Sequence, residues 1–387
     1  MNNSSWFSLI SVKQRVWLFA TIAIMLLIVA AGFLPDSSKE LLKPTDFNAS
    51  MSIKEMALKL GVTRKSLARE LNLPLSVRKG KPVKTLGITN EELHHVVEHI
   101  LSHTDATLKY YIYAALVLGG LVFLVRLGRP DGSVIKDRKG WYPGTPYIIF
   151  LLISVIAAGF LLGKSPNPME AIVKVFKSMV GLYPDPIVKV IALLFFIILA
   201  IVGNKIICGW ACPFGSLQEL IFYLPILRKI KKKKVPFVLI NSIRAIIFAV
   251  MLLFLFGIVG GRKGFVIYHY VNPFNLFNLD FESLSIILTI IIVLLLSLFA
   301  YRPFCQLICP FGFVSWIFER FSIFRVRVDK NICTQCGACS NACPTEAAKG
   351  IVAGNKMPAD CFSCCRCLNS CPVDAIKYTF KTRTTPP

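Results

Sequence analysis

The residues of this sequence that are best suited to metal or redox chemistry are its thirteen cysteines, none of which precedes Cys208. Two stretches, CTQCGACSNACP at 333–344 and CFSCCRCLNSCP at 361–372, repeat the pattern Cys-x2-Cys-x2-Cys-x3-Cys-Pro. Cysteine thiolates at this spacing hold the irons of 4Fe-4S clusters, which transfer single electrons. Two complete runs therefore predict two such clusters. Zinc, which also binds Cys-x2-Cys pairs, is the weaker alternative.

The spacing also predicts which cysteines share a cluster. In bacterial two-cluster ferredoxins, the fourth cysteine of each run ligates the other cluster. The first cluster is thus assigned to Cys333, Cys336, Cys339 and Cys371, and the second to Cys361, Cys364, Cys367 and Cys343. Cys365 lies outside this register, and we expect it to be a neighbouring thiol without a ligand role.

A different cysteine motif occurs twice upstream, as CGWACPFG at 208–215 and CQLICPFG at 305–312, each time after a long apolar segment. Two parallel hairpins about an axis along the membrane normal would bring both copies together at the inner face of a membrane. The four thiols are those of Cys208, Cys212, Cys305 and Cys309. They could hold an additional iron–sulfur centre or a soft metal such as copper(I). The alternative is that Pro-Phe-Gly ends a helix and the cysteines pack inertly.

The elements that position these cysteines are apolar helices. The chain of 387 residues is 55% hydrophobic with a mean hydropathy of +0.62, which is typical of a membrane protein. A spanning helix needs roughly 20 apolar residues. Six segments are candidates: 16–34, 110–127, 147–162, 187–202, 237–259 and 284–300. The predicted fold is an α-helical integral membrane protein of about six spans with an internal repeat, followed by a two-cluster ferredoxin-like α+β module.

The formal charge of +23 is distributed unevenly between the loops. Lys and Arg residues concentrate after the second and fourth spans, an asymmetry that marks the cytoplasmic side of the bacterial inner membrane. The N-terminus and all the cysteines are then predicted to be cytoplasmic, where disulfides are disfavoured and metal ligation is favoured. The same asymmetry accounts for the basic composition without nucleic acid as a partner.

Five domains are predicted along the chain. They are an N-terminal membrane anchor at 1–34, which we expect to stay uncleaved, a small helical extracytoplasmic domain at 35–108, a transmembrane bundle at 109–300, the second Cys-x3-Cys-Pro motif with a linker at 301–326, and the ferredoxin module at 327–380. A histidine-rich helix is expected over 90–103. Metal or haem ligation by His95, His99 and His103 is the weaker alternative to simple packing of this helix. Covalent c-type haem is not expected because Cys-x-x-Cys-His is missing from the sequence.

In combination, the two Cys-x3-Cys-Pro motifs and the tandem ferredoxin runs resemble the membrane-bound polyferredoxin family, over about residues 140–380. That family includes quinol-oxidising, regulatory and copper-reducing proteins. The resemblance implies electron transfer between the quinone pool, the clusters and a redox partner. The protein would be one subunit of a respiratory oxidoreductase complex rather than a stand-alone enzyme.

Two residues are candidate quinone contacts: Arg244, which lies inside the fifth predicted span, and His269 in the outer segment that follows it. Two alternatives to quinone-linked electron transfer remain open. One is a reductase or assembly factor for copper held by the four motif cysteines. The other is a membrane-tethered, redox-sensing regulator that uses residues 50–75, which superficially resemble a helix-turn-helix. DNA binding would require that segment inside the cell, and the span count opposes this.

Overall fold

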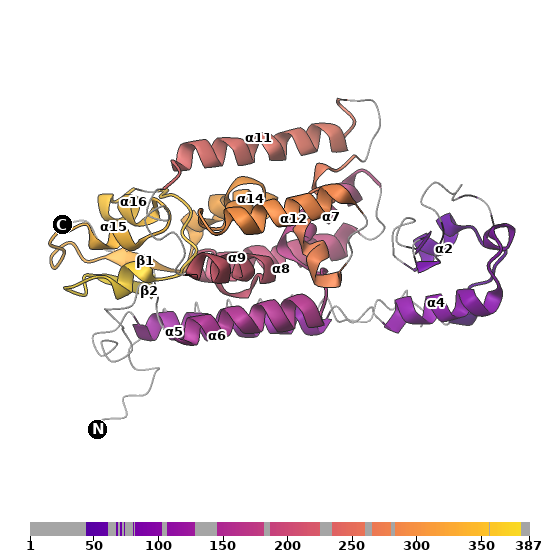
Figure 1. The fold of residues 1–387 in the computed structure, drawn as a ribbon, viewed down its shortest axis with the longest axis horizontal. Helices are drawn as coiled ribbons and strands as arrows, with labels where there is room; N and C mark the ends of the chain where they lie inside the picture. The colour runs from indigo at the N-terminus through magenta and orange to yellow at the C-terminus, as the bar shows by residue number, and fades with distance from the viewer. Residues whose placement is uncertain are drawn as a thin grey trace, which may run out of the picture.

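The computed structural model describes a helical bundle with the cysteine-rich module at one end and a small helical unit at the other (Figure 1). The described residues are 44–60, 67–68, 70–71, 73, 80, 82–102, 107–127, 145–181, 186–224, 234–259, 265–279, 283–355 and 357–380. The predicted anchor at 16–34 and His103 lie outside these residues. The predictions made for them therefore stay predictions.

The small unit contains the helices α2 (Ile53–Lys59) and α4 (Asn90–Ser102) and the 3-10 turns η2 (Pro44–Asp46) and η3 (Val83–Leu86). A capping box starts α4, which lies where the sequence predicts the histidine-rich helix. The amide of Glu92 donates to the Thr89 hydroxyl (3.3 Å), and the Glu92 carboxylate accepts from the Thr89 amide (3.2 Å). The unit has its own hydrophobic core, separate from that of the bundle.

Three helices of the bundle are long and apolar enough to cross a membrane. They are α5 (Thr107–Leu127), α8 (Pro186–Gly203) and α11 (Phe237–Leu255). Two further apolar helices are shorter: α6 (Thr145–Ile153), which continues as the π-helix η5 (Ser154–Leu161), and α12 (Leu284–Leu296). The five coincide with five of the six predicted spans, but within the described ranges only three have the length of a full span.

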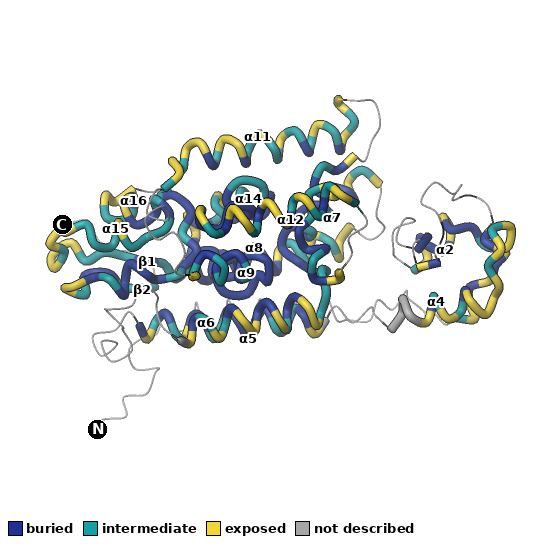
Figure 2. The backbone as a smooth tube through the Cα atoms, viewed as in Figure 1, coloured by how far each residue is buried: buried dark blue, intermediate teal, exposed yellow. Residues whose placement is uncertain are grey.

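The outside of the bundle is apolar. Figure 2 shows exposed positions along α11 and α5 around a buried interior, and the exposed residues include Ile187, Val238 and Leu284. Soluble proteins rarely leave so much apolar surface uncovered, whereas lipid covers such a surface in a membrane.

The internal repeat is evident in the order of the elements. Unit one contains α6 with η5, α7 (Pro168–Met179), α8 and α9 (Pro213–Tyr223), and unit two contains α11, η8 (Pro273–Asn278), α12 and α14 (Pro310–Phe318). The elements α7 and η8 begin alike, because Asn167 and Asn272 cap them through side-chain oxygens (2.8 and 3.1 Å) and a proline follows each asparagine. Since α14 packs on both α7 and α8, the two units interlock.

The C-terminal module is a small α+β fold. Strands β1 (Phe324–Val328) and β2 (Ile376–Phe380) pair antiparallel, with Phe324 opposite Phe380. Three short helices lie between them in sequence: α15 (Ala338–Ala342), α16 (Ala347–Ala353) and α17 (Arg366–Asn369). Val326 and Tyr378 are buried on the inner face of the sheet, toward the hydrophobic core that the module shares with the bundle.

Candidate iron–sulfur site

The second cysteine run forms a cavity together with one cysteine of the first run. Cys361, Cys364 and Cys367 line it with Cys343, and it contains about 360 Å³ of empty space, part of which is open to solvent. Burial raises the pKa of Cys364 to about 11 and raises the pKa of Cys361 and Cys367 well above the ordinary value. Such thiols ionise when a bound cation offsets their charge, so this donor set fits an iron–sulfur cluster.

The other predicted ligand set lies nearer the surface. Cys333 and Cys371 are both within electrostatic range of Cys339, and α15 packs against α17, which directly precedes Cys371 in the chain. Burial raises the pKa of Cys339. Cys336 is exposed, and the backbone amide of Ala338 lowers the pKa of its thiol. One set is therefore enclosed, whereas the other meets solvent.

The two cysteine runs share left-handed backbone positions at matched places. Gln335 and Ser363 occupy matched places in the two runs and have φ of 54° and 51°. One residue after the following cysteine, the first run has Gly337 (φ 75°) and the second has Cys365 (φ 54°). Cys365 therefore stands where the loop needs a left-handed residue, a conformation that glycine adopts without strain. Its buried thiol also lines the cavity, beside the four predicted ligands.

The structure corrects the predicted position of the two Cys-x3-Cys-Pro motifs. The sequence places them at the inner face of the membrane, but each motif turns back into the bundle. Phe214 packs against Phe274 of η8, with ring centroids 5.9 Å apart, although η8 belongs to the opposite end of the hairpin. Similarly, Phe311 packs against Phe196 of α8 at 6.4 Å. The helices α9 and α14 thus run beside the spans instead of beyond them (Figure 1).

The two motifs bring four buried cysteines together inside the bundle. Cys208 is within electrostatic range of Cys212, Cys305 and Cys309, and each of the four keeps 7–9% of its surface uncovered. Cys212 and Cys309 are the N-cap residues of α9 and α14, with proline at the first helical position. Proline has no N–H to lose there, and the backbone amides of the next two residues act on the thiol in each motif.

The glycine of each Pro-Phe-Gly motif makes room for a buried arginine. A Cβ atom on Gly215 would lie 2.8 Å from the Cys208 carbonyl oxygen and 3.0 Å from Arg302. A Cβ atom on Gly312 would lie 2.3 Å from the Cys305 carbonyl oxygen and 3.1 Å from Arg244. Only glycine allows both approaches, so each motif admits a guanidinium group beside its cysteines.

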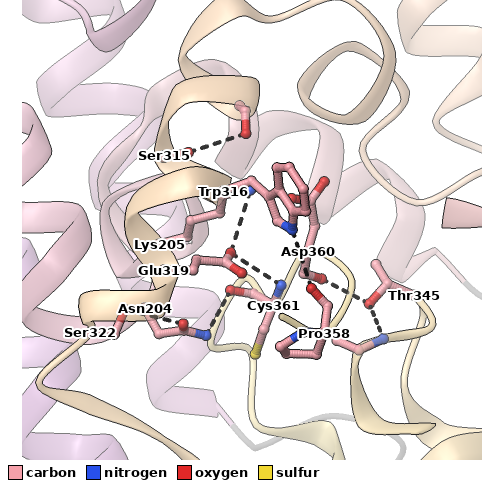
Figure 3. Close-up of polar contacts among 12 residues, drawn as sticks. Asn204, Lys205, Ser315, Trp316, Glu319, Ser322, Thr345, Pro358, Asp360 and Cys361 are labelled. Atoms are coloured by element: carbon pink, nitrogen blue, oxygen red, sulfur yellow. Dashed lines mark hydrogen bonds and ion pairs between the residues drawn. The ribbon is translucent and has the colours of Figure 1, made fainter. Parts of the chain in front are cut away.

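A buried ion-pair network joins the bundle to the start of the second cysteine run (Figure 3). The Lys205 ammonium and the Arg244 guanidinium both bond the carboxylate of Asp360, the latter at 2.8 Å, and Lys205 also lies 3.4 Å from Glu319. Burial raises the pKa of Glu319. Burial also acts to raise the pKa of Asp360, but Lys205 and Arg244 together outweigh it and lower that pKa. Asp360, next to Cys361, is therefore the stable anion of this network.

A second network lies on the other side of the same junction. Glu219 of α9 accepts bonds from Arg302 (2.7 Å) and from Arg366, and all three side chains are fully or almost fully buried. Arg302 also donates to the carbonyl oxygens of Cys208 and Gly209. The sequence analysis missed these residues. The signal was available, since Glu219 and Arg302 are charged residues directly next to apolar helices, where an unpaired charge is costly.

The closest approach between motif and module is at Gly209. A Cβ atom on this residue would come within 2.0 Å of the carbonyl oxygen of Phe362, so only glycine fits. Next to it, the indole of Trp210 donates to the Ser363 carbonyl (3.1 Å), and the amide of Asn204 donates to the Cys361 carbonyl (3.3 Å). The second cysteine run is therefore held directly against the first membrane motif.

The two candidate quinone contacts lie at opposite ends of the bundle. Arg244 bonds Asp360 and Asn241 inside the junction, so its guanidinium group is committed to an ion pair. His269 is exposed on the opposite end of the bundle, and its Nε2 lies 3.0 Å from Lys177 Nζ of α7. Neighbouring Tyr268 is buried within electrostatic range of Cys309, which links this end of the bundle to the four-cysteine group.

Single-ion geometry is a separate question from cluster geometry. Across the described ranges, no three His, Cys, Asp or Glu side chains converge closely enough to surround one metal ion. His94 of the histidine-rich helix instead bonds the Phe47 carbonyl at 2.9 Å, and nothing can be said of the side chain of His99.

Two family models match parts of the chain. A model described as a 4Fe-4S binding domain matches residues 186–234, and one described as a 4Fe-4S dicluster domain matches residues 303–347. The first match contains Cys208 and Cys212 and no other cysteine, while the second contains the other membrane motif and the first ferredoxin run. No solved structure matches the chain.

Several known proteins are similar to this one. An uncharacterised protein of Methanocaldococcus jannaschii is 28% identical over 201 residues, which cover 51% of this chain and 71% of that protein. The regulatory protein NosR of Stutzerimonas stutzeri is 29% identical over 171 residues, or 42% of this chain and 23% of NosR. The ferredoxin-type protein NapH of Haemophilus influenzae is 26% identical over 166 residues, or 42% of this chain and 55% of NapH.

The two 4Fe-4S domain matches and the similarity to NosR and NapH agree with the resemblance to the polyferredoxin-like membrane family that the cysteine motifs indicate. It is an iron–sulfur electron-transfer protein with membrane-type helices, as its cysteine runs predict. The alignments span less than two thirds of NosR and of NapH, so the activities of those whole proteins do not transfer to this polyferredoxin-like chain.

Proposed function

We propose that this protein carries electrons between the quinone pool of the bacterial inner membrane and a redox partner, as a subunit of a respiratory complex. The observation that carries the proposal is the cavity lined by Cys343 with Cys361, Cys364 and Cys367, since cysteines from two separate runs line one space there. Clusters of the 4Fe-4S type supply one-electron redox chemistry with little structural rearrangement. The second ligand set of this proposal is Cys333, Cys336, Cys339 and Cys371.

The surroundings of the two ligand sets support a proposal for which set meets the redox partner and which meets the membrane part. Cys336 is exposed beside exposed Ile332, which gives a soluble partner access to the first set. The second run is instead held against the bundle by the Asp360 ion pairs and by the Gly209 contact. The module thus presents one set to the partner and the other to the membrane part. In this proposal the module is cytoplasmic, and residues 35–108 are extracytoplasmic.

We further propose that Cys208, Cys212, Cys305 and Cys309 hold a third redox centre. Four buried cations of the described structure lie within electrostatic range of these thiols: Lys205 near Cys208, Lys109 near Cys212, Arg302 near Cys212 and Cys305, and Arg244 near Cys309. Buried cations favour an anionic occupant, as thiolate-bound metal centres are. The match of a 4Fe-4S binding model to residues 186–234 supports an iron–sulfur centre over copper.

The quinone head group is proposed to bind near His269. The exposed ring of His269 with Lys177 offers hydrogen-bonding groups at the end of the bundle away from the module. Apolar helices around this end suit a hydrophobic tail. On this proposal, His269→Gln slows reduction of the protein by a quinol analogue and leaves reduction by dithionite unchanged.

Iron and acid-labile sulfide content with EPR spectroscopy tests the whole proposal. Full-length protein is purified without oxygen and reduced separately by a quinol analogue and by dithionite. About eight irons with two cluster signals, at least one of them appearing with quinol, is the result expected for the two ferredoxin sets. About twelve irons, falling to about eight in Cys208→Ser, would assign the third centre to the membrane cysteines.

Two outcomes would redirect the proposal. Copper bound to the four membrane cysteines in place of iron would make the protein a copper reductase or assembly factor. Full reduction by dithionite with no response to any quinol analogue would exclude quinol as the electron source. A soluble electron donor would then be favoured.

A further inference from the structure

The hydroxyl of Tyr301 is buried and has no hydrogen-bond partner among the described residues. A buried hydroxyl that makes no hydrogen bond costs about 1–3 kcal/mol of stability. A phenylalanine at this position would avoid that cost. The hydroxyl therefore needs a partner that the described residues do not supply.

The Tyr301 ring is also locked, so the hydroxyl cannot swing to another partner. Phe222 and Phe362 pack edge-on against it, with centroids at 5.3 and 5.6 Å. The guanidinium carbons of Arg302 and Arg366 lie 5.5 and 5.3 Å from the ring centroid. Because a phenylalanine ring would keep all four contacts, they do not account for the hydroxyl.

Tyr301 lines the cavity formed by the four cysteines that include Cys343 and Cys364. We propose that the Tyr301 hydroxyl donates a hydrogen bond to a sulfur atom of the cluster held in this cavity. The inference rests on the proposed function, since it requires that cluster. It adds a residue that lies outside both cysteine runs and comes from the bundle, so the membrane part takes a direct share in setting the cluster potential.

A hydrogen bond to sulfur strengthens when the cluster accepts an electron, because the acceptor becomes more negative. The hydroxyl therefore favours the reduced form and raises the reduction potential. No bond is broken and no proton leaves the tyrosine. The oxygen keeps its hydrogen in both oxidation states, and one electron changes place.

The test is an EPR-monitored redox titration of full-length Tyr301→Phe protein. Cys364→Ser identifies the signal that belongs to this cluster. We expect unchanged iron content and a reduced-to-oxidised ratio that falls roughly threefold to tenfold at a fixed potential, where tenfold equals ~59 mV for one electron. Replacing Tyr301 by 3-fluorotyrosine, a stronger donor of similar size, should move the ratio in the opposite direction.

Tyr268→Phe is the matched control. Its hydroxyl is likewise buried without a partner in the described structure, but it lies near Cys309 and not near this cavity. It should leave the potential of the cavity cluster unchanged. An unchanged potential in both Tyr301 variants, with iron retained, would overturn the inference alone and assign the hydroxyl to another group such as a water. If Cys364→Ser removed no EPR signal that the unmodified protein shows, the cavity would hold no cluster, and the inference and the proposed function would both be wrong.

Discussion

At the scale of single residues, the chemistry of this protein depends on thiols whose charge the surroundings must balance. Burial raises the pKa of Cys361, Cys364 and Cys367, so these thiols would stay protonated without a cation, while Cys336 is exposed and the pKa of its thiol is lowered. Around the membrane cysteines, Lys205, Arg244 and Arg302 supply positive charge from within the protein itself.

Cys343→Ala should remove the cluster of this cavity, because Cys343 is the one cysteine of the first run that lines it. The expected result is a loss of about four irons and of one EPR signal. Cys365→Ala is the control, since Cys365 lines the same cavity but is expected to fill a turn position instead of binding iron. Equal iron loss in both variants would contradict the ligand assignment.

Glu219→Gln should destabilise the junction strongly. Arg302 and Arg366 both bond this buried carboxylate, and removing one partner of a buried ion pair costs ~3–5 kcal/mol. Thermal unfolding in detergent would measure the loss. Glu98→Gln, on the exposed face of α4, should change stability by less than about 0.5 kcal/mol. A Glu219 variant as stable as the Glu98 variant would show that the network carries little energy.

At this scale, the sequence predicts metal chemistry well and electrostatic support poorly. Cysteine spacing in the runs indicates iron–sulfur binding, and the family matches confirm it. Glu219, Arg302 and Asp360 give no such local pattern, because their partners lie more than eighty residues away in the chain. Long-range pairing of single charges leaves no periodic signal in a sequence.

At the scale of elements, the two Cys-x3-Cys-Pro motifs are loops that return into the bundle. Lys205 and Arg302 occupy the same place, three residues before the first cysteine of each motif, and both have left-handed φ (60° and 46°). That turn reverses the chain, and Pro213 and Pro310 then begin α9 and α14. Hydropathy cannot reveal such a return, because the apolar residues of a re-entrant segment look like the end of the span before it.

The same difficulty affects the number of spans. Hydropathy located five of the apolar helices that the structure describes, but it overstated two of their lengths. Helix α11 ends at Leu255, before the predicted limit at residue 259, and α12 ends at Leu296, before the predicted limit at residue 300. The third predicted span keeps its length but changes from α6 to the π-helix η5 midway. Hydrogen-bond register and helix ends depend on tertiary contacts that composition does not encode.

Gly209→Ala should loosen the contact between the first motif and the second cysteine run. The added methyl group would meet the backbone of Phe362, which cannot move aside as a flexible side chain could. We expect retained iron but at least tenfold slower electron exchange between the module and the membrane cysteines, followed by stopped-flow spectroscopy.

Gly80→Ala is the control for this glycine change, since nothing lies within 4 Å of the added Cβ. Trp210→Phe removes the bond to the Ser363 carbonyl and part of the ring packing on Tyr147 and Phe150, and should also slow the exchange. Unchanged exchange rates in both junction variants would exclude this contact as the connection.

At the scale of the whole molecule, three parts share the work. The apolar bundle shields the four-cysteine group, the α2–α4 unit stands at one end, and the module with β1 and β2 stands at the other (Figure 1). Within the module, Cys336 of the first set is exposed, whereas Phe362 of the second run meets Gly209 of the first membrane motif. In the proposed function, this arrangement would let the module connect a water-soluble partner with the sulfur ligands next to the bundle.

The two ends should lie on opposite sides of the membrane. Ser50 and Lys349 are both exposed, one in the α2–α4 unit and one in the module. A membrane-impermeant maleimide should label Ser50→Cys in intact cells and Lys349→Cys only after permeabilisation, with unmodified protein giving the background. Labelling of both positions in intact cells, or of neither, would contradict the predicted topology.

The return of both motifs into the bundle has an electrical consequence. An electron that moves between the four buried cysteines and the module travels along the bundle axis, and so along the direction of the membrane field. A charge crossing a whole membrane exchanges ~2.3 kcal/mol with the field for every 100 mV, and a partial crossing exchanges a proportional part. Motifs at the surface would transfer electrons without sensing this voltage. If the four cysteines hold the proposed third centre inside the membrane, its exchange with the module would be electrogenic, and the membrane voltage would speed or slow the flow of electrons.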